Sequence, residues 1–355
     1  MGVTVPSPSV LPVVLGVDAG GTKTDVAICD LKGNVLANTR GRSRLPQYVG
    51  PAEAVANLLG YLEPLVAALN ARFDHGVQMT HATLSMSGAD LPEEIDAITT
   101  EARRQLAPAG LISDDLVVEN DMFALLRAGT SAADALVVGC GTGMNCVGHR
   151  ANGSTARFSS LGYLSGDWGG GSDLSRAAFW HACRGEDGRG QFTELSAAIA
   201  QFAGTATAVE AAHRLHLGQL GQDLYDGFAP TIFEIAERSG DPVATRLVRS
   251  QADEIIAYVR AAMQQLGWPA DRPSLAEGPT EILLGGSVIV ARHPLLIDQV
   301  IPAIEQLAPS AAITFVTAKP VLGSVLSSLD RAHGGTTPDQ IEQQVREDLN
   351  SVNHH

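Results

Sequence analysis

The sequence predicts an α/β fold whose two halves share one repeated unit of strand, glycine turn and strand. Two observations carry this prediction. Apolar runs rich in Val, Ile and Leu alternate with helical periodicity along most of the 355 residues. One short glycine-rich pattern also occurs twice. A chain of this length, with 45% hydrophobic residues, has ample material for two globular domains with buried cores.

The first copy of the pattern is VDAGGTKTD at 17–25, and a second β-type run, Asp25–Cys29, follows it. A Walker loop would carry glycine where Thr22 precedes the lysine, and a dinucleotide fingerprint would open a helix after its glycines. The stretch therefore matches neither motif, and taken alone it fits a hairpin turn. Asp18, together with Thr22 and Thr24, adds polar groups that suit an anion accompanied by a metal.

The second copy, VVGCGTGMNCVG, begins at Val137. Agreement at both turns of the unit favours a duplication over chance. Two such units would hold a polyphosphate between the backbone N–H groups of their turns. A constant offset of 120 residues relates four pairs of positions: Val17 and Val137, Gly21 and Gly141, Thr22 and Thr142, and Gly33 and Gly153.

The remaining elements follow the same alternation. Tight turns join the first three strand-like runs, which indicates an antiparallel section, and strand–helix crossovers then indicate parallel pairing. The segment 173–267 is mostly helical by its periodicity. The polar tail from Gly334 predicts a frayed end or a short surface helix. We expect strands at 13–17, 25–29, 35–39, 82–86, 116–118, 136–138, 146–149, 281–284 and 313–316, and helices at 52–72, 93–106, 193–202, 242–266, 294–307 and 322–329.

Composition argues against several classes of function. The formal charge of −15, without a cluster of Lys and Arg, disfavours nucleic-acid binding. No apolar run reaches the length of a membrane span, and Met1–Pro12 lacks the basic and apolar stretches of a secretion signal. The four cysteines show no paired spacing, as in a reduced protein. We therefore expect a cytoplasmic protein with neither a nucleic-acid nor a membrane partner.

A third glycine turn, LLGGSV at 283–288, follows another predicted strand. With this turn the chain resembles the actin/Hsp70/sugar-kinase superfamily. More narrowly, it resembles the BadF/BadG/BcrA/BcrD-type ATPase family, especially its N-acetylglucosamine kinases. The resemblance runs from about Val13 to Leu329 and depends on the order and spacing of six segments: GVDAGGTKTDVAI, LSMSGAD, VVENDMFAL, VVGCGTGMNCVG, LGYLSGDWGGGSDL and LLGGSV.

The resemblance implies a duplicated actin-like ATPase fold, of the ribonuclease H-like kind, with two domains around a nucleotide cleft. We expect an N-terminal actin-like domain at 1–119 and a C-terminal actin-like domain at 120–355. The second domain contains a helical insert at about 173–267. The final helix, at about 320–331, is expected to pack back on the N-terminal domain.

The resemblance also implies ATP and Mg²⁺ as cofactors. Asp18 would hold the metal ion through water. The glycine turns would hold the nucleotide, with Gly20, Gly21, Thr22, Lys23, Gly141, Thr142 and Gly143 around the phosphates, and Gly285, Gly286 and Ser287 at the adenosine.

Asp121 matches the catalytic carboxylate of these kinases. A carboxylate near a sugar hydroxyl accepts its proton as that oxygen bonds to the γ-phosphorus, so Asp121 suits a general base. A structural interpretation stays open, because Asn120 and Asp121 also fit the N-terminal cap of a helix at 122–128.

Two positions of the implied sugar site depart from the family pattern. Leu45 stands where an N-acetylglucosamine kinase has asparagine, and Trp168 replaces the glutamate of a GDEG turn. An indole stacks on sugar C–H surfaces but also serves as a packing residue, so both interpretations of Trp168 stay open. Arg42 and Arg44 add positive charge near this edge, either for an anionic or carbonyl-bearing substituent or as solvated surface. Sugar contacts are implied at Ser87, Gly88, Asp121, Asn145, Asp167 and Trp168.

The resulting prediction is an ATP-dependent carbohydrate kinase that transfers the γ-phosphate to a hydroxyl of an amino sugar. N-acetylglucosamine or glucosamine is the expected substrate, with a 6-phosphate product, and a homodimer is the expected assembly. One alternative is a kinase of another hexose or of a cyclitol. Another is an ATPase activator of a reductase or dehydratase, whose iron–sulfur cluster needs closely placed cysteines that Cys140 and Cys146 do not suit. A sugar-responsive regulator would need a zinc-binding cysteine cluster, which the four cysteines do not form.

Overall fold

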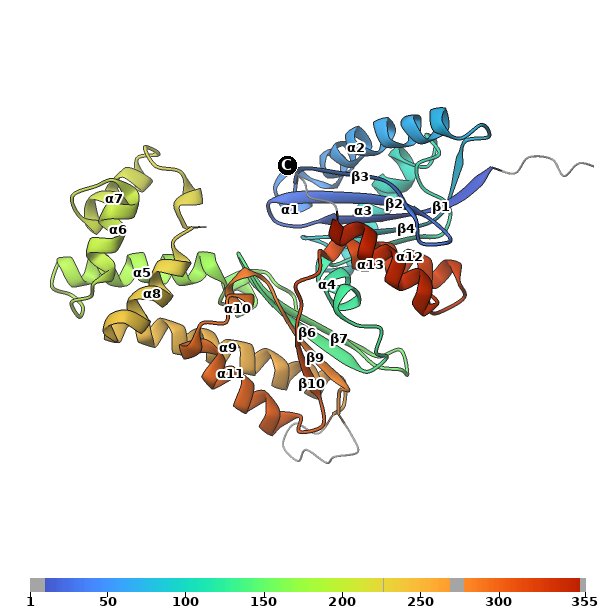
Figure 1. The fold of residues 1–355 in the computed structure, drawn as a ribbon. Helices are drawn as coiled ribbons and strands as arrows, with labels where there is room; N and C mark the ends of the chain where they lie inside the picture. Colours follow the sequence, from blue (N-terminus) through green and yellow to red (C-terminus); the bar gives the residue numbers. More distant parts are fainter. Residues whose placement is uncertain (1–9, 226, 269–277, 352–355) are drawn as a thin grey trace, which may run out of the picture. The chain divides into compact units, whose positions relative to one another are not determined.

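The chain forms two compact units in a computed structural model (Figure 1). The first unit contains the residues up to Ser131 and those from Ala318 onward, and the second contains Ala132–Thr317. The structure describes residues 10–225, 227–268 and 278–351. The sequence predicts no secretion signal in Met1–Pro12, and residues 1–9 of that segment lie outside these ranges.

The first unit is built on a five-stranded sheet in the order β3-β2-β1-β4-β5. β1 pairs antiparallel with β2, and β2 with β3, whereas β1, β4 and β5 run parallel. This order reproduces the expected antiparallel section followed by crossovers. The strands are β1 Leu11–Ala19, β2 Lys23–Asp30, β3 Val35–Arg42, β4 Val77–Met86 and β5 Leu116–Glu119.

The side chains of β1 alternate between two buried faces. Val13, Leu15 and Val17 pack into one core with α2 and α3, and Val14 packs into a second core with α12. Figure 1 shows α2 and α12 on opposite sides of this sheet. A strand covered on both faces needs the uninterrupted apolar run that the sequence carries. The helices of the unit are α1 Pro46–Val49, α2 Pro51–Arg72, α3 Pro92–Gln105, α4 Asp121–Gly129, α12 Pro320–Ala332 and α13 Asp339–Ser351.

One helix of the first unit has the dimensions of a membrane span. α2 is 22 residues long and apolar enough by composition to cross a bilayer. A core helix passes the same test, and α2 packs on the sheet of its own unit, so it supports a membrane span only weakly. Its buried residues are Ala54, Val55, Leu58, Leu62, Val66 and Leu69.

The polar tail of the chain forms a helix, which agrees with one of the two expectations and corrects the other, that of a frayed end. α13 buries Val345 and Leu349 in the core that also contains α12, and Ile341 packs against that core. These three residues are spaced by four positions, so they lie on one face of the helix. This apolar stripe is only one residue wide within an otherwise polar sequence. The overall polarity of the tail therefore did not reveal that the helix packs against the core.

The second unit repeats the topology of the first. Its sheet has the order β10-β9-β6-β7-β8, with β6, β7 and β8 antiparallel and β6, β9 and β10 parallel. The related turn glycines also match, with φ of +88° at Gly33 and +86° at Gly153. The duplication is therefore confirmed in strand order and in turn geometry. The strands are β6 Ala135–Cys140, β7 Met144–His149, β8 Thr155–Arg157, β9 Glu281–Gly285 and β10 Ala312–Phe315.

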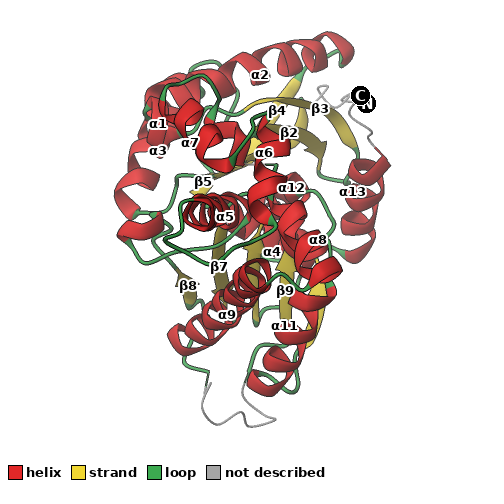
Figure 2. Ribbon diagram, turned by 90° about the vertical axis from the view of Figure 1, so that its left-hand side faces the viewer, coloured by secondary structure: helices red, strands yellow, loops and turns green. Residues whose placement is uncertain are grey.

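Most of the described residues between β8 and β9 are helical, as the periodicity predicted. The longest of them, α9, packs against β6, β7 and β8 and shares the core of this unit (Figure 2). The helices of the unit are α5 Gly171–Glu186, α6 Leu195–Ala203, α7 Ala208–His216, α8 Ala229–Ser239, α9 Pro242–Gln265, α10 Ser287–Val290 and α11 Pro294–Leu307, with short 3₁₀ turns at Gly162–Leu164 and Gln222–Tyr225.

The two units divide the chain at other positions than the domains expected at 1–119 and 120–355. α4 belongs to the first unit, because it packs against α12 and β4. α12 packs in turn against β1, β2 and β4 of the same unit. The limits of the functional domains stay a prediction.

Candidate functional site

A row of polar and charged side chains crosses the first sheet where β1 ends. Asp18 on β1 lies opposite Asp25 on β2, which lies opposite Arg40 on β3. Arg40 donates from Nε and Nη2 to the two carboxylate oxygens of Asp25, at 2.6 and 2.9 Å. On the other side of Asp18 stands Ser85 on β4, whose hydroxyl donates to Glu119 at 3.1 Å. The row therefore places two buried carboxylates on neighbouring strands beside the first glycine turn.

Asp18 occupies an electrostatically unfavourable position. Burial raises the pKa of its carboxyl group well above the usual value, and the charges of Asp121 and Asp25 raise it further. Lys23 and Arg40 act in the opposite direction with smaller effect. A bound cation would stabilise the charged form of such a carboxylate, so Asp18 suits the role of a metal ligand.

Asp121 begins α4 but does not cap it. The cap is Asn120, whose side-chain oxygen accepts a hydrogen bond from the N–H of Met122 at 2.9 Å. Asp121 Oδ2 lies 4.0 Å from the position that a β-carbon at Gly20 would occupy. Burial raises the pKa of Asp121 to about 6, against the opposing effect of nearby backbone N–H groups. The structure thus brings the expected base to the first glycine turn and assigns the cap to its neighbour.

The loop after β4 carries two of the expected sugar residues, Ser87 and Gly88. The N–H of Ser87 donates to the carbonyl of the last residue of β1 at 2.9 Å. Further along the loop, Asp90 accepts a hydrogen bond from Asn120 Nδ2 at 2.7 Å. One asparagine therefore caps α4 and also fastens the loop, which links the position of Ser87 to that of Asp121. Sequence reasoning gave Asn120 only the capping role and missed Asp90.

Three glycine turns of the second unit pack backbone against backbone. A β-carbon at Gly286 would overlap the backbone of Cys140, and one at Gly170 would come within 2.5 Å of the backbone of Gly143. Gly286 and Gly170 also have positive φ, at +87° and +82°. Only glycine fits these two contacts, which explains physically why the late turn and the turn before α5 are rich in glycine.

A cavity of about 140 Å³ opens beside these turns. The expected nucleotide residues Gly141, Thr142 and Ser287 line it. Phe233 also lines it, and the ring of Phe233 stacks on His293 with centroids 4.5 Å apart. A concave, largely apolar surface beside a glycine turn suits a flat aromatic group that is linked to phosphates. The other lining residues are Gly171, Gly227, Ala229, Pro230, Val288, Ala291 and His293.

Asp167 and Trp168 lie in the turn that leads into α5. Asp167 accepts a hydrogen bond from the hydroxyl of Tyr258 at 2.6 Å and another from the hydroxyl of Ser165. Trp168 is partly buried and packs against the core of the second unit, which favours its packing interpretation. Asn145, the third expected sugar residue of this unit, lies on β7 and accepts a hydrogen bond from the next N–H at 2.7 Å.

Sequence reasoning missed two residues of α9 that contact the same turn. Gln251 is fully buried and accepts a hydrogen bond from the N–H of Gly170 at 2.8 Å. Tyr258, which donates to Asp167, follows Gln251 by seven positions, so both side chains lie on one face of the helix. A glutamine inside an apolar helical stripe is the signal that would have indicated this face, because a buried amide needs partners.

Some residues near the first turn do not join the site. Thr24 alternates with Asp25 along β2, so it faces the other side of the sheet. The hydroxyl of Thr24 is buried without a hydrogen-bond partner among the described residues. Arg44 forms an ion pair with Glu53, and Leu45 immediately precedes α1. The exposed residues of the turn itself are Gly21, Thr22 and Lys23.

The acidic residues of the first unit suit a magnesium ion only in part. Among the described residues, no three His, Cys, Asp or Glu side chains are grouped so as to hold a metal ion. Magnesium in phosphoryl-transfer proteins is bound by one or two carboxylates and completed by substrate phosphates and water. The buried carboxylate of Asp18, beside Asp121 and Asp25, suits such a partial site.

Known proteins with similar sequences and structures cover most of the chain. Residues 15–325 match the model of the BadF/BadG/BcrA/BcrD ATPase family. The N-acetylmuramic acid/N-acetylglucosamine kinase of Clostridium acetobutylicum is 26% identical over 71% of this chain and 80% of its own length. The N-acetyl-D-glucosamine kinase of Dictyostelium discoideum is 23% identical over 90% of this chain and 98% of its own length. A candidate N-acetylglucosamine kinase from Chromobacterium violaceum shares the fold, with a TM-score of 0.65 at 22% identity over 90% of this chain and 99% of that one.

Proposed function

The chain belongs to the BadF/BadG/BcrA/BcrD ATPase family, and from that membership we propose that it is an ATP-dependent kinase of an amino sugar. The observation that carries the proposal is Asp121, which lies at a glycine turn, leaves the helix cap to Asn120, and has a pKa of about 6. A general base works best with a pKa near the operating pH. The names of the two similar kinases support N-acetylglucosamine as the acceptor. Glucosamine as another acceptor and a 6-phosphate as the product are proposed on the family resemblance alone.

The proposed nucleotide-binding residues lie in the glycine turns that the sequence singled out. Backbone N–H groups at Gly20–Lys23 and at Gly141–Gly143 hold the phosphates of ATP. The cavity lined by Phe233 and Ser287 receives the adenosine. Asp18 holds a magnesium ion, which when bound neutralises charge on the phosphates.

The proposed acceptor chemistry needs one proton transfer. Asp121 accepts the proton of the sugar hydroxyl and orients that oxygen toward the γ-phosphorus. Ser87, with Gly88, and Asp167, with Asn145, hydrogen-bond other groups of the sugar. Trp168 packs behind the turn and shapes the site without offering the carboxylate of the family pattern.

The cysteines favour a kinase over an ATPase activator. Burial raises the pKa of the Cys140 thiol to about 12 and that of Cys146 higher still. Cys29 is also fully buried. Iron–sulfur ligation uses thiolates, and thiols in such surroundings stay protonated. All four cysteines are free thiols, which also supports our proposal of a cytoplasmic protein; a homodimer is proposed on the family resemblance alone.

A coupled ADP-release assay tests the proposed function. The panel contains N-acetylglucosamine, glucosamine, N-acetylmuramic acid, glucose and a cyclitol, each with ATP and Mg²⁺. The expected result is sugar-dependent ADP release that is fastest with one of the amino sugars. Faster turnover of glucose or the cyclitol would replace the substrate class, and ADP release that no sugar stimulates would contradict the kinase. The Asp121→Asn variant controls for contaminating kinases, because its rate should fall for every acceptor.

A further inference from the structure

α9 presents one face to the turn that carries Asp167. Gln251 engages the N–H of Gly170, and Tyr258 engages the carboxylate of Asp167. Glu254 follows Gln251 by three positions and precedes Tyr258 by four, so it lies between them on the same helical face. The helix therefore directs Glu254 toward the turn from Asp167 to Gly170.

The carboxylate of Glu254 has no partner of its own. The side chain is only partly exposed, and no hydrogen bond or ion pair engages it within the described part of the chain. Burial raises the pKa of Glu254, and the charges of Asp253 and Asp167 raise it further. A partly buried, unpaired carboxylate close to another carboxylate lowers the stability of the folded state. Such an arrangement is typical of a group that serves a ligand.

Four hydrogen-bond donors of the turn and of α9 already have other partners. The N–H of Gly169 donates to Asp173 at 3.2 Å, and that of Gly170 donates to Gln251. The hydroxyl groups of Ser165 and Tyr258 donate to Asp167. These four donors therefore do not serve Glu254, and a hydroxyl group of a bound sugar supplies the chemistry that its carboxylate needs.

We propose that Glu254 is a substrate-binding residue that accepts a hydrogen bond from a sugar hydroxyl beside the one bound by Asp167. This inference rests on the proposed function and narrows it to sugars with two adjacent free hydroxyl groups. The turn carries Trp168 at the position where the family pattern has glutamate, so the turn itself lacks that carboxylate. Glu254 on α9 supplies a carboxylate to the same region from a different element. Gln251 and Tyr258 are positioning residues, because their hydrogen bonds hold the turn beside the helical face that carries Glu254.

The first test compares two carboxylates on the same helix. Glu254→Gln keeps the size of the side chain and removes its charge. Asp253→Asn is the matched control, because Asp253 is exposed and precedes Glu254 on another face of α9. We expect Glu254→Gln to raise the KM for N-acetylglucosamine by about tenfold, the scale of one hydrogen bond to a charged group, and to leave the KM for ATP unchanged. The control should change neither constant.

Deoxy analogues of the sugar sharpen the test. One of the 3-deoxy and 4-deoxy analogues of N-acetylglucosamine should react with the wild-type protein about tenfold less efficiently than the parent sugar. In Glu254→Gln, the same analogue and the parent sugar should react equally well, because the hydrogen bond is absent in both. Equal discrimination by the two proteins would overturn the assignment.

Stability without any ligand gives an independent readout. Removing an unpaired charge beside Asp167 should raise the Tm of Glu254→Gln, whereas a residue with a structural role would lower it. A lower Tm, or an unchanged KM for the sugar in an active enzyme, overturns only the inference about Glu254. A wild-type protein that responds to no sugar contradicts the proposed function and this inference with it, so the two failures are distinguishable.

Discussion

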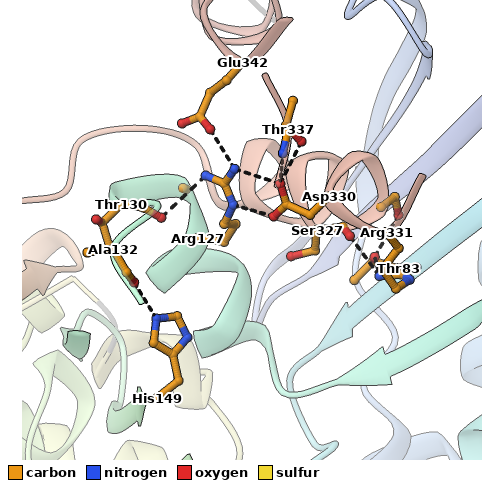
Figure 3. Close-up of polar contacts among 12 residues, drawn as sticks. Thr83, Arg127, Thr130, Ala132, His149, Ser327, Asp330, Arg331, Thr337 and Glu342 are labelled. Carbon is orange, nitrogen blue, oxygen red and sulfur yellow. Dashed lines mark hydrogen bonds and ion pairs between the residues drawn. The ribbon is translucent and has the colours of Figure 1, made fainter. Parts of the chain in front are cut away.

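Arg127 on α4 and Asp330 on α12 share two hydrogen bonds, from Nε at 2.7 Å and from Nη2 at 3.1 Å (Figure 3). Nη2 of Arg127 also donates to Glu342 on α13 at 2.6 Å. Asp330 accepts two further hydrogen bonds from the N–H and the hydroxyl of Thr337. These contacts join three helices of the first unit. The helix that begins with Asp121 is therefore held in place from its far end.

Replacing Arg127 by methionine should destabilise the protein by about 3–5 kcal/mol, because the largely buried carboxylate of Asp330 loses its cation and that of Glu342 keeps Arg346 alone. The side chain of Arg127 is 11% exposed, and those of Asp330 and Glu342 are 19% and 16% exposed. Urea denaturation measures the change. Arg189→Met is the matched control, because the Arg189–Asp187 pair lies on the surface and should contribute little. Equal stability of the two variants would contradict the importance of the buried network.

The same network predicts sensitivity to acid. Burial acts to raise the pKa values of Asp330 and Glu342, but hydrogen bonds and charge from Arg127 act against it. Hydrogen bonds from Thr337 add to this effect at Asp330, and Arg346 adds to it at Glu342, so both pKa values lie below their usual values. A carboxyl group with a lower pKa in the folded state stabilises the protein above its unfolded-state pKa, and that stabilisation disappears as the pH falls through the folded-state pKa. We expect the free energy of unfolding to fall below about pH 4.5. The fall should be shallower in Arg127→Met, and an identical pH profile would refute this account.

Two helical glycines should respond to alanine with opposite signs. A β-carbon at Gly323 on α12 would overlap the carbonyl of Ala124 on α4, whereas nothing lies within 4 Å of a β-carbon at Gly60 on α2. Gly60→Ala should stabilise the protein by about 0.5–1 kcal/mol through helix propensity. Gly323→Ala should destabilise it by about 1–3 kcal/mol, because two helices must move apart. Thermal unfolding of both variants measures the difference, and a stabilising Gly323→Ala would show that α4 and α12 do not pack this closely.

Asp121→Asn should lower turnover by about 10²–10⁴-fold, because the amide cannot accept the proton of the sugar hydroxyl. Asn120 supplies the cap, so the helix should persist and the Tm should not fall. ATP should still raise the Tm of the variant, since a ligand that binds the folded state stabilises it. A variant with near wild-type turnover would exclude Asp121 as the base, and Asp167 would be tested next.

The pH dependence of the reaction should report the same group. Burial raises the pKa of Asp121 to about 6, and a general base acts only when it is deprotonated. The kcat/KM for the sugar should therefore rise as the pH increases through about 6 and then level off. The residual activity of Asp121→Asn should lack this rise. A profile that is flat from pH 5 to pH 8 in the wild-type protein would contradict the assignment.

The local parts of the fold were predictable because their causes are local. The apolar runs identified the strands, and the offset between Gly33 and Gly153 identified a duplication that the two sheets confirm. Asp121 was placed correctly at a helix start, because a strand followed by a cap residue is a short-range pattern. Its role as a base stays a prediction that the kinetic experiments test.

The contacts between distant segments were not predictable. Gln251 meets Gly170 and Arg127 meets Asp330 across long stretches of chain, and no short-range pattern specifies such partners. The polar side chains involved look like ordinary surface residues until the tertiary structure buries them. The same holds for α13, whose narrow apolar stripe acquires meaning only against the core around α12.

The placement of α12 and α13 has a consequence for synthesis on the ribosome. β1 to β5 emerge early, but α12 and α13, which share the core of Val14, Ala27 and Cys29, follow the second unit in the chain. The whole of Ala132–Thr317 leaves the ribosome in between. The second unit can therefore finish folding before the helices that pack on this face of the first sheet have been synthesised. The nascent chain must carry an open apolar sheet face through this interval. Chaperone binding should therefore be strongest late in translation, just before the last two helices emerge.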